Sequence, residues 1–415
     1  MIIRLILIIR PLYPPSGGNP IRSWIMATQP RSARPWYRAL QTIHLWAGLI
    51  LCLPLAVLGI TGSILVYEHE LEDLFSTPAV HSMAVGEPQS IAAILDTAKA
   101  NAPQGLAPGM VSLPAAAGEP ASVRLMAPGR SGPGGGGATM LIDPVSLAVL
   151  ETSKPGRDGL MRQIFMLHAN LLIPDRTGRD VVGWLGVAML VLGVSGLVLW
   201  WPRPGRWMQS FQIKRGARGV RLHRDLHGAV GIWTLAVFVV VSFTGVYITF
   251  PQTLHSAVAT LSPTRDLRAA VKVEPVRGAE PAGPDQAVAL ALAAVPDGRV
   301  RAVGLPARPD QAYRITLAGP DARPGAPAIT AFVDPWTARV VEVRDPRSYS
   351  AGETFVAWQR PLHAGQGLGW VWQVLVFLSG VLPPLFAVTG TAMWYLKRRN
   401  RRAKDAERAA ARATV

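Results

Sequence analysis

Four of the eight histidines stand at the ends of long apolar segments, where metal-binding side chains could face one another. His44 and His227 begin two of these segments, and His168 and His363 lie shortly before two others. Neutral imidazole is the commonest metal ligand in proteins, and haem iron accepts an axial ligand on each face of its ring. Two facing histidine pairs in a helix bundle therefore indicate two iron–porphyrin sites, one toward each end.

An internal repeat pairs these histidines. One set of residues is His44, Gly48 and Thr61-Gly62, which recurs as His227, Gly231 and Thr244-Gly245. The other set is His168 and Ser195-Gly196, which recurs as His363 and Thr389-Gly390. Both repeats start on the same side of the membrane, which predicts a parallel duplication with a pseudo-two-fold axis along the membrane normal. Such an axis places each histidine opposite its counterpart.

Four stretches are long and apolar enough to cross a bilayer, which takes about 20 residues. They are residues 43–67, 181–201, 228–250 and 370–396. Pro54, Pro383 and Pro384 lie inside them, which membrane helices tolerate because neighbouring helices satisfy the freed backbone groups. The sequence therefore predicts a membrane protein with a four-transmembrane-helix bundle, in which these histidines lie at or near the ends of the spans.

Basic residues set the orientation of the bundle. Segments 1–42, 202–227 and 397–415 flank the spans and are rich in Lys and Arg, with Asp225, Asp405 and Glu407 as their only acids. Cytoplasmic loops carry such an excess, so these segments and both chain ends are predicted to be cytoplasmic. Residues 68–180 and 251–369 then lie outside. The net charge of +16 is explained by this topology, and no nucleic-acid partner is expected.

Both exterior segments are predicted to be α+β domains. Residues 91–102 and 284–296 have helical apolar spacing. Stretches that alternate as strands do are 121–128 and 138–151 in the first segment, and 299–307, 312–319 and 328–344 in the second. Asp143-Pro144 and Asp334-Pro335 each lie between two alternating stretches, which is typical of a hairpin turn. The chain is thus expected to hold two exterior domains of like fold, each ending in an interfacial segment with a histidine.

The composition excludes several other classes of protein. Apolar residues make up 49% of the 415 residues and charged residues only 16%, against about 25% charge in soluble domains. A single cysteine, Cys52, excludes a disulfide framework, a four-cysteine zinc site and a cysteine-ligated iron–sulfur cluster. No glycine-rich dinucleotide fingerprint follows a predicted strand.

The first 25 residues differ in composition from the rest of segment 1–42. Their apolar run is too short to span a membrane and carries no cleavage site, and Met26 precedes a more ordinary opening. We expect residues 1–25 to be an over-extended start or a disordered leader, with the first span serving as an uncleaved anchor.

Other interpretations of the histidines stay open at this stage. Each one alone is a hydrogen-bonded residue at the membrane edge. His223 and His227 have the spacing of a zinc site, although Asp225 would be a poor third ligand on the same helix. A proton relay through histidine is a further reading, but no acidic residue lies within a span.

On these residues the chain resembles the PepSY-associated transmembrane family of bacterial inner-membrane proteins. The resemblance rests on HLWAG with ITG in the first span, LHRDLHGAVG with FTG in the third, the Asp-Pro hairpins, and the LHA segments before the second and fourth spans. The family is linked to iron acquisition. Members similar to this chain include ferric-siderophore reductases that carry b-type haems, and their exterior domains are PepSY-like and periplasmic.

The resemblance implies two haem b groups, with iron bound through the haems only. His44 and His227 are expected to hold an inner haem and His168 and His363 an outer one, with His223 in reserve for the inner site. Arg38, Arg221 and Arg224 are candidates to hold propionates. Residues expected on the substrate side are Arg162, Gln163, Trp358 and Arg360, with Gln359 between the last two. No catalytic residue is predicted, and whether each pair shares one haem is left open.

The expected function is electron transfer across the membrane to a ferric siderophore or similar Fe(III) chelate. The electron donor would be another protein or a membrane quinol, because the chain has no dinucleotide site of its own. The alternative is a membrane-anchored PepSY-type binding or regulatory protein without haem, in which the histidine pairs are structural.

Overall fold

The structure of the protein is a computed structural model. It describes residues 34–68, 70–71, 84, 86–116, 118–127, 137–153 and 159–413. The leader expected over residues 1–25 lies outside the described residues, so that prediction stays untested.

Four helices are long and apolar enough to cross a membrane. They are α1 (Pro35–Val66), α5 (Asp175–Trp200), α7 (Gly219–Thr249) and α11 (Trp370–Ala413). The predicted spans lie within them, apart from one residue at the end of each of the first three. The helices run on beyond the apolar stretches; in α11 the extension is rich in Ala, Arg and Lys, which are strong helix formers.

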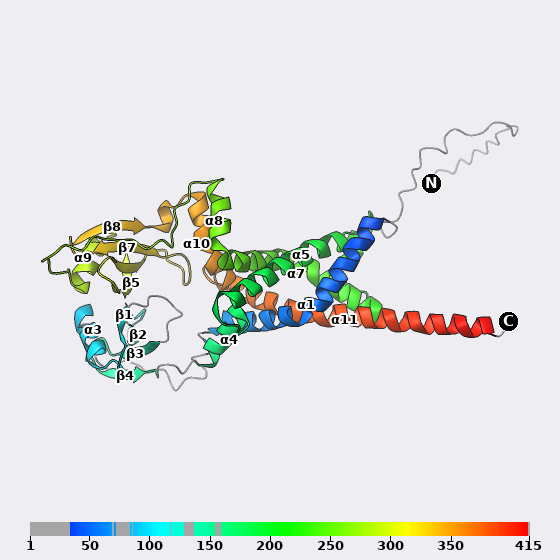
Figure 1. Ribbon diagram of the computed structural model, residues 1–415, viewed down its shortest axis with the longest axis horizontal. Helices are drawn as coiled ribbons and strands as arrows, with labels where there is room; N and C mark the ends of the chain where they lie inside the picture. Colours follow the sequence, from blue (N-terminus) through cyan, green and yellow to red (C-terminus); the bar gives the residue numbers. More distant parts are fainter. Residues whose placement is uncertain are drawn as a thin grey trace, which may run out of the picture. The chain divides into compact units, whose positions relative to one another are not determined.

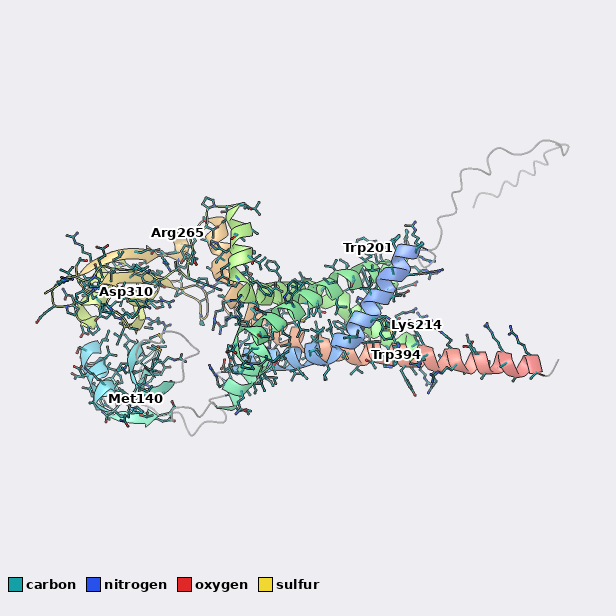
Figure 2. The ribbon with its side chains drawn as sticks, in the orientation of Figure 1. Met140, Trp201, Lys214, Arg265, Asp310 and Trp394 are labelled. Carbon is teal, nitrogen blue, oxygen red and sulfur yellow. The ribbon has the colours of Figure 1, made fainter. Side chains whose placement is uncertain are left out.

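Small residues allow these helices to approach closely. α7 packs against both α5 and α11. α1 meets α11 where Gly59 and Gly380 face each other, and neither glycine has room for a Cβ. The Ser63 hydroxyl donates to the Phe377 carbonyl across the same contact at 2.7 Å. Trp201, Lys214 and Trp394 lie toward the same end of the helices, as the basic segments require (Figure 2).

Two shorter helices carry the remaining predicted histidines. α4 (Leu160–Asn170) precedes α5, and α10 (Ala351–His363) precedes α11. α10 starts with a capping box, in which Ser350 and Glu353 satisfy each other's backbone N–H groups. The other short elements are α6 (Trp207–Ser210), α8 (Pro251–Ala259) and a 3-10 helix (Pro346–Ser348).

The strands of residues 68–180 and 251–369, the two segments predicted to lie outside, form one antiparallel sheet. They are β1 (Ala107–Ser112), β2 (Ala121–Met126), β3 (Gly137–Ile142), β4 (Val149–Thr152), β5 (Arg299–Gly304), β6 (Tyr313–Ala318), β7 (Ile329–Asp334) and β8 (Arg339–Arg344). Their order is β4-β3-β2-β1-β5-β6-β7-β8. β1 pairs with β5, with Val111 opposite Val303, so the two segments expected as separate domains share a continuous sheet.

Two helices cover one face of this sheet (Figure 1). α3 (Ile91–Ala100) packs on β1 to β3 and α9 (Pro284–Ala294) on β5 to β8. Alternate strand residues point into the core between them, and Val111, Val123, Val303 and Ile315 are wholly buried there. The carboxylate of Asp285, on α9, accepts hydrogen bonds from the first two N–H groups of α3 at 2.8 and 3.1 Å, which links the two segments again.

Both predicted hairpins are present. Asp143 directly follows β3 and accepts hydrogen bonds from the Val145 and Ser146 N–H groups. Asp334 ends β7 and accepts one from the Trp336 N–H group. Each aspartate thus holds the tight turn that follows its own strand.

Candidate functional site

The four predicted histidines lie in two close pairs. The ring centroids of His44 and His227 are 6.4 Å apart, at an interplanar angle of 76°. Those of His168 and His363 are 6.1 Å apart, at 42°. We call the first the basic-end pair, after the basic segments beside it, and the second the sheet-end pair.

Every Nδ1 atom in these pairs has a hydrogen-bond partner. At the sheet-end pair, His168 Nδ1 lies 3.0 Å from the Leu58 carbonyl oxygen, and His363 Nδ1 lies 3.0 Å from that of Val241. A carbonyl can only accept, so both nitrogens carry the proton. The hydroxyls of Thr61 and Thr244 lie 3.1 and 3.2 Å from the same two nitrogens.

The basic-end pair reaches the same protonation state through hydroxyls alone. His44 Nδ1 lies 2.8 Å from Ser195 Oγ, and His227 Nδ1 lies 2.9 Å from Thr389 Oγ1. Each hydroxyl donates its own proton to a carbonyl in its own helix, Ser195 to Leu192 and Thr389 to Leu385. The hydroxyls must therefore accept from the imidazoles. In the neutral imidazole, a proton on Nδ1 leaves Nε2 unprotonated, which is the form that binds a metal.

The spacing of each pair fits two axial ligands on one iron. A metal–imidazole bond is about 2.0 Å long and the ring centre lies about 1.1 Å behind the nitrogen, so two axial imidazoles place their centroids about 6.2 Å apart. The observed separations are 6.4 and 6.1 Å. The donor set, two imidazoles with their Nδ1 atoms fixed by hydrogen bonds, would suit a haem held by two histidines.

Glycines of the repeated Thr-Gly and Ser-Gly pairs give the imidazoles room. A Cβ on Gly62 would lie 2.9 Å from Cε1 of His168, and one on Gly245 would lie 3.0 Å from Cε1 of His363. The corresponding distances at the basic-end pair are 3.5 Å from Gly196 to His44 and 3.9 Å from Gly390 to His227. Each dipeptide thus supplies a hydroxyl for Nδ1 and a surface against which the ring lies.

Space also remains one helical turn from the basic-end pair. A Cβ on Gly48 would meet nothing within 4 Å, and one on Gly231 would meet only the ring of Phe386. Open space at these two glycines would leave room for a planar macrocycle beside the two imidazoles.

The two pairs are well separated along the helices. His44 and Leu58 both lie on α1, and His227 and Val241 both lie on α7, with the same residue spacing. At 1.5 Å per residue, the contacts of the sheet-end pair lie about 21 to 26 Å from the basic-end histidines. The predicted pairing within each end is therefore present, and pairing between the ends is excluded by distance.

Two of the three arginines expected to hold propionates beside the basic-end pair form ion pairs. Arg221 and Arg224 both pair with Asp225, at 3.4 and 3.5 Å. Arg38 lies on α1 ahead of His44. Their role as propionate contacts stays a prediction. His223 lies one turn before His227, and its buried Nδ1 has no hydrogen-bond partner among the described residues.

The zinc alternative gains nothing from this arrangement. Within the described ranges, no group of three or more His, Cys, Asp or Glu side chains gathers as metal ligands. Among these residues, His223 and His227 have no third protein ligand of the kind that a zinc site takes.

The expected substrate-side residues lie on α4 and α10. Arg162 and Trp358 are half-buried, while Gln163 and Arg360 are exposed. Gln359 is buried one turn before His363, and its Oε1 has no hydrogen-bond partner in the described part of the chain. All of these residues precede His168 or His363 on the same helix. Their role toward a substrate stays a prediction.

An ion pair fixes α10, the helix that carries His363. The buried Glu353 carboxylate accepts a hydrogen bond from Arg265, and the Gly352 N–H donates to Ser262 at 3.0 Å. The hydrogen bond from Arg265 holds the pKa of the Glu353 carboxyl below its usual range, despite partial desolvation. Sequence analysis missed this anchor, because Arg265 and Glu353 lie far apart in the chain.

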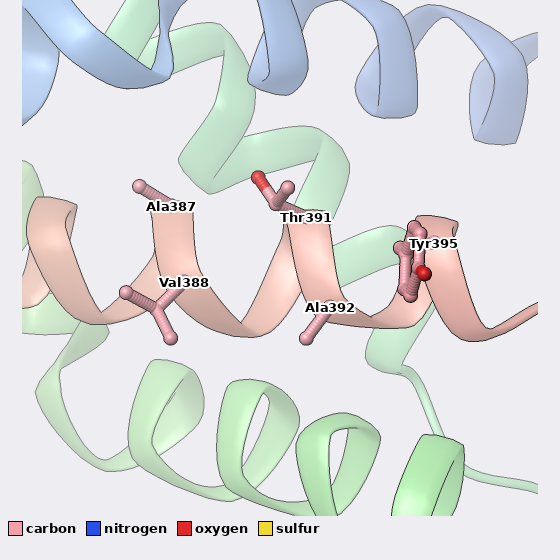
Figure 3. Close-up of a pocket in the computed structure, with 5 residues that line it drawn as sticks. All are labelled: Ala387, Val388, Thr391, Ala392 and Tyr395. Atoms are coloured by element: carbon pink, nitrogen blue, oxygen red, sulfur yellow. The ribbon is translucent and has the colours of Figure 1, made fainter.

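A pocket on α11 lies apart from the histidines. It has a volume of about 520 Å³ and is lined by Ala387, Val388, Thr391, Ala392 and Tyr395 (Figure 3). With 3.6 residues per turn, these positions face away from Thr389 and Gly390, which contact His227. The pocket is open and apolar, and none of the paired histidines lines it.

The comparisons with known proteins bear on the chain as a whole. The profile of the family described as the PepSY-associated TM region matches residues 41–397, which include both histidine pairs and all eight strands. A comparison with curated proteins found no match.

Proposed function

The chain belongs to the PepSY-associated transmembrane family, and on that premise we propose that it is a di-haem protein which carries electrons across the bacterial inner membrane to an Fe(III) chelate. The observation that carries the proposal is the geometry of the two histidine pairs. Both have the separation of axial ligands, and each imidazole in its neutral form presents an unprotonated Nε2.

The proposed orientation follows from charge. Basic segments flank the end of the helices that holds His44 and His227, and the positive-inside rule makes this end cytoplasmic. The chain ends are then cytoplasmic and the sheet is periplasmic. We also infer that the two halves are duplicated units, each with a PepSY-like set of strands, because the same hydroxyl–histidine contact occurs at four matched positions.

The residues of the chain have the following proposed roles. His44 and His227 would hold one haem b, and His168 and His363 the other; each bound haem supplies one-electron exchange between ferric and ferrous iron. The serine, threonine and carbonyl acceptors keep each imidazole in the ligating tautomer. The apolar helices exclude water from the pairs. Two sites about 21 to 26 Å apart cover most of a hydrocarbon core about 30 Å thick.

The proposed substrate is an Fe(III) chelate such as a ferric siderophore, taken at the sheet side. Iron reduced from Fe(III) to Fe(II) has a lower charge, and hard oxygen donors hold it less tightly. The electron donor is proposed to be a cytoplasmic protein or a membrane quinol.

The direct test is the haem content of the purified full chain. Expression with a haem precursor should give a red protein with two haem b per chain, both reducible by dithionite. His255→Ala serves as a control, because His255 lies on α8, outside both pairs, and should leave both haems in place. A colourless protein after haem-supplemented expression would favour the membrane-anchored binding protein instead.

Reduction of the chelate is tested separately. Protein loaded with haem and reduced beforehand should release Fe(II) from a ferric chelate to a chromogenic Fe(II) chelator. If the haems remain reduced in the presence of excess chelate, the substrate part of the proposal fails.

A further inference from the structure

Among the described residues, α3 and α9 pack on one face of the eight-stranded sheet and no helix packs on the other. Val123 and Leu125 of β2 and Ile315 of β6 point to the α3 and α9 side and are wholly buried. Neighbouring residues in a strand point to opposite faces, so Arg124 and Arg314 lie on the other face. Both arginines are exposed.

The uncovered face is confined to the central strands. Over β7 and β8, the segment before α9 covers the same face. The buried Arg344 side chain donates hydrogen bonds to two carbonyl oxygens of this segment, those of Leu267 and Ala269. Thr330 and Phe332, which share that face, are buried. In contrast, Ser112, Ser122 and Ala302 on the central strands remain half-exposed.

Arg124 and Arg314 lie in one cross-strand row. Arg124 of β2 pairs with Met110 of β1, Met110 pairs with Gly304 of β5, and Gly304 pairs with Arg314 of β6. Three strand spacings separate the two arginines, which is about 14 Å between their backbones. They flank the β1–β5 junction, with Met110 beside Arg124 and Gly304 beside Arg314 in the same row.

Neither guanidinium is neutralised by the part of the chain that the structure describes. The ion pairs and side-chain hydrogen bonds of the described residues do not include Arg124 or Arg314. The five strands from β3 through β2, β1 and β5 to β6 contain four arginines and no Asp or Glu. Charged side chains on these five strands are therefore all positive. An acidic residue of the neighbouring strand β4, Glu151, lies opposite Leu141, one row away from Arg124.

We propose that this open sheet face binds a small anionic metal chelate. Arg124 and Arg314 would each donate hydrogen bonds to oxygen atoms at one end of the chelate. Arginine suits this role because its planar guanidinium donates two parallel hydrogen bonds to a carboxylate. The identity of the metal as iron rests on the function proposed above, whereas the binding of an anionic chelate does not. The site selects by charge, so cationic chelates are excluded.

The test measures binding alone, on the full chain in lipid nanodiscs. The probe is gallium(III) citrate, an anionic chelate of a trivalent ion that is not reduced, followed by isothermal titration calorimetry. The comparison probe is gallium(III) desferrioxamine B, which has a net positive charge. We expect saturable binding of the first, weakened by added salt, and at least tenfold weaker binding of the second.

The variants are Arg124→Gln, Arg314→Gln and the double variant. Each single change should weaken gallium(III) citrate binding roughly tenfold, since a charged hydrogen bond is lost, and the double change more than either. Lys99→Gln is the matched control: it removes one positive charge from α3, on the helix-covered face, and should leave the affinity unchanged. Arg124→Lys and Arg314→Lys should retain part of the affinity and check that the sheet is folded.

Three results would overturn the proposal. They are no binding of gallium(III) citrate by the natural chain, an unchanged affinity in the folded double variant, and binding of metal-free citrate as tight as that of its gallium complex. Haem plays no part in this readout. Haem-free protein that still binds the chelate would contradict the proposed function alone, and haem-loaded protein that does not would contradict this inference alone.

Discussion

His168 donates its Nδ1 proton to the Leu58 carbonyl oxygen at 3.0 Å, across two segments of the chain that are 110 residues apart. Thr61 offers a second acceptor to the same nitrogen at 3.1 Å. At the other end of the helices, His44 has the Ser195 hydroxyl as its acceptor, at 2.8 Å. The sheet-end imidazoles are therefore held twice and the basic-end imidazoles once.

This difference predicts unequal effects of hydroxyl removal. Ser195→Ala leaves the Nδ1–H of His44 without its acceptor, and loss of such an outer partner typically weakens metal binding about 10- to 100-fold. Thr61→Val leaves the Leu58 carbonyl in place, so haem retention should change less than about threefold. Haem retention against a haem-scavenging apoprotein measures both. Equal losses in the two variants would contradict the idea that the Leu58 carbonyl still holds His168 when the Thr61 hydroxyl is removed.

Glycine substitution should discriminate between the pairs in the same way. In Gly62→Ala the new Cβ would lie 2.9 Å from Cε1 of His168, which forces the ring to shift. In Gly390→Ala the distance to His227 is 3.9 Å, an ordinary contact. We expect the first variant to lose about one haem per chain and the second to keep both, as read from absorbance per protein. Full haem content in Gly62→Ala would contradict the seating of His168 on Gly62.

The Glu353 anchor predicts a pH dependence of stability. The hydrogen bond from Arg265 makes the carboxyl pKa lower in the folded chain than in the unfolded chain, where it is about 4.5. The anchor therefore contributes fully above the unfolded pKa and is lost as the pH falls through the folded pKa. Glu353→Gln should lower the free energy of unfolding by about 1 to 3 kcal/mol at pH 7. The difference from the natural chain should shrink below pH 4 in chemical denaturation. A difference that stays constant down to pH 3 would remove the ion pair as its cause.

The positions of the spans and the pairing of the histidines could be predicted from the sequence. The spans were readable because an apolar stretch of about 20 residues is a strong constraint. The pairing was readable because His44 and His227, and likewise His168 and His363, occupy matched places in a repeat. The aspartate turns were readable for a local reason, since Asp143 and Asp334 satisfy their own following backbone.

The contacts between distant segments could not be predicted. Thr61-Gly62 was visible as a repeated dipeptide, but its role depends on which helix faces it, and His168 comes from a different helix. β1 was missed because Pro108 and Gly109 interrupt the alternation of Ala107–Ser112. Because β1 was not predicted, its pairing with β5 could not be predicted either. That pairing joins the two segments predicted to lie outside into one sheet.

The most direct test of the central claim compares two double variants of the histidines. His168→Ala with His363→Ala removes both ligands of one site and should leave one haem per chain. His44→Ala with His168→Ala removes one ligand from each site and should leave none that is stably bound. Haem per chain, measured as the pyridine complex, is predicted to be about two, one and zero for the natural chain and these variants. Equal haem content in the two double variants would contradict the account.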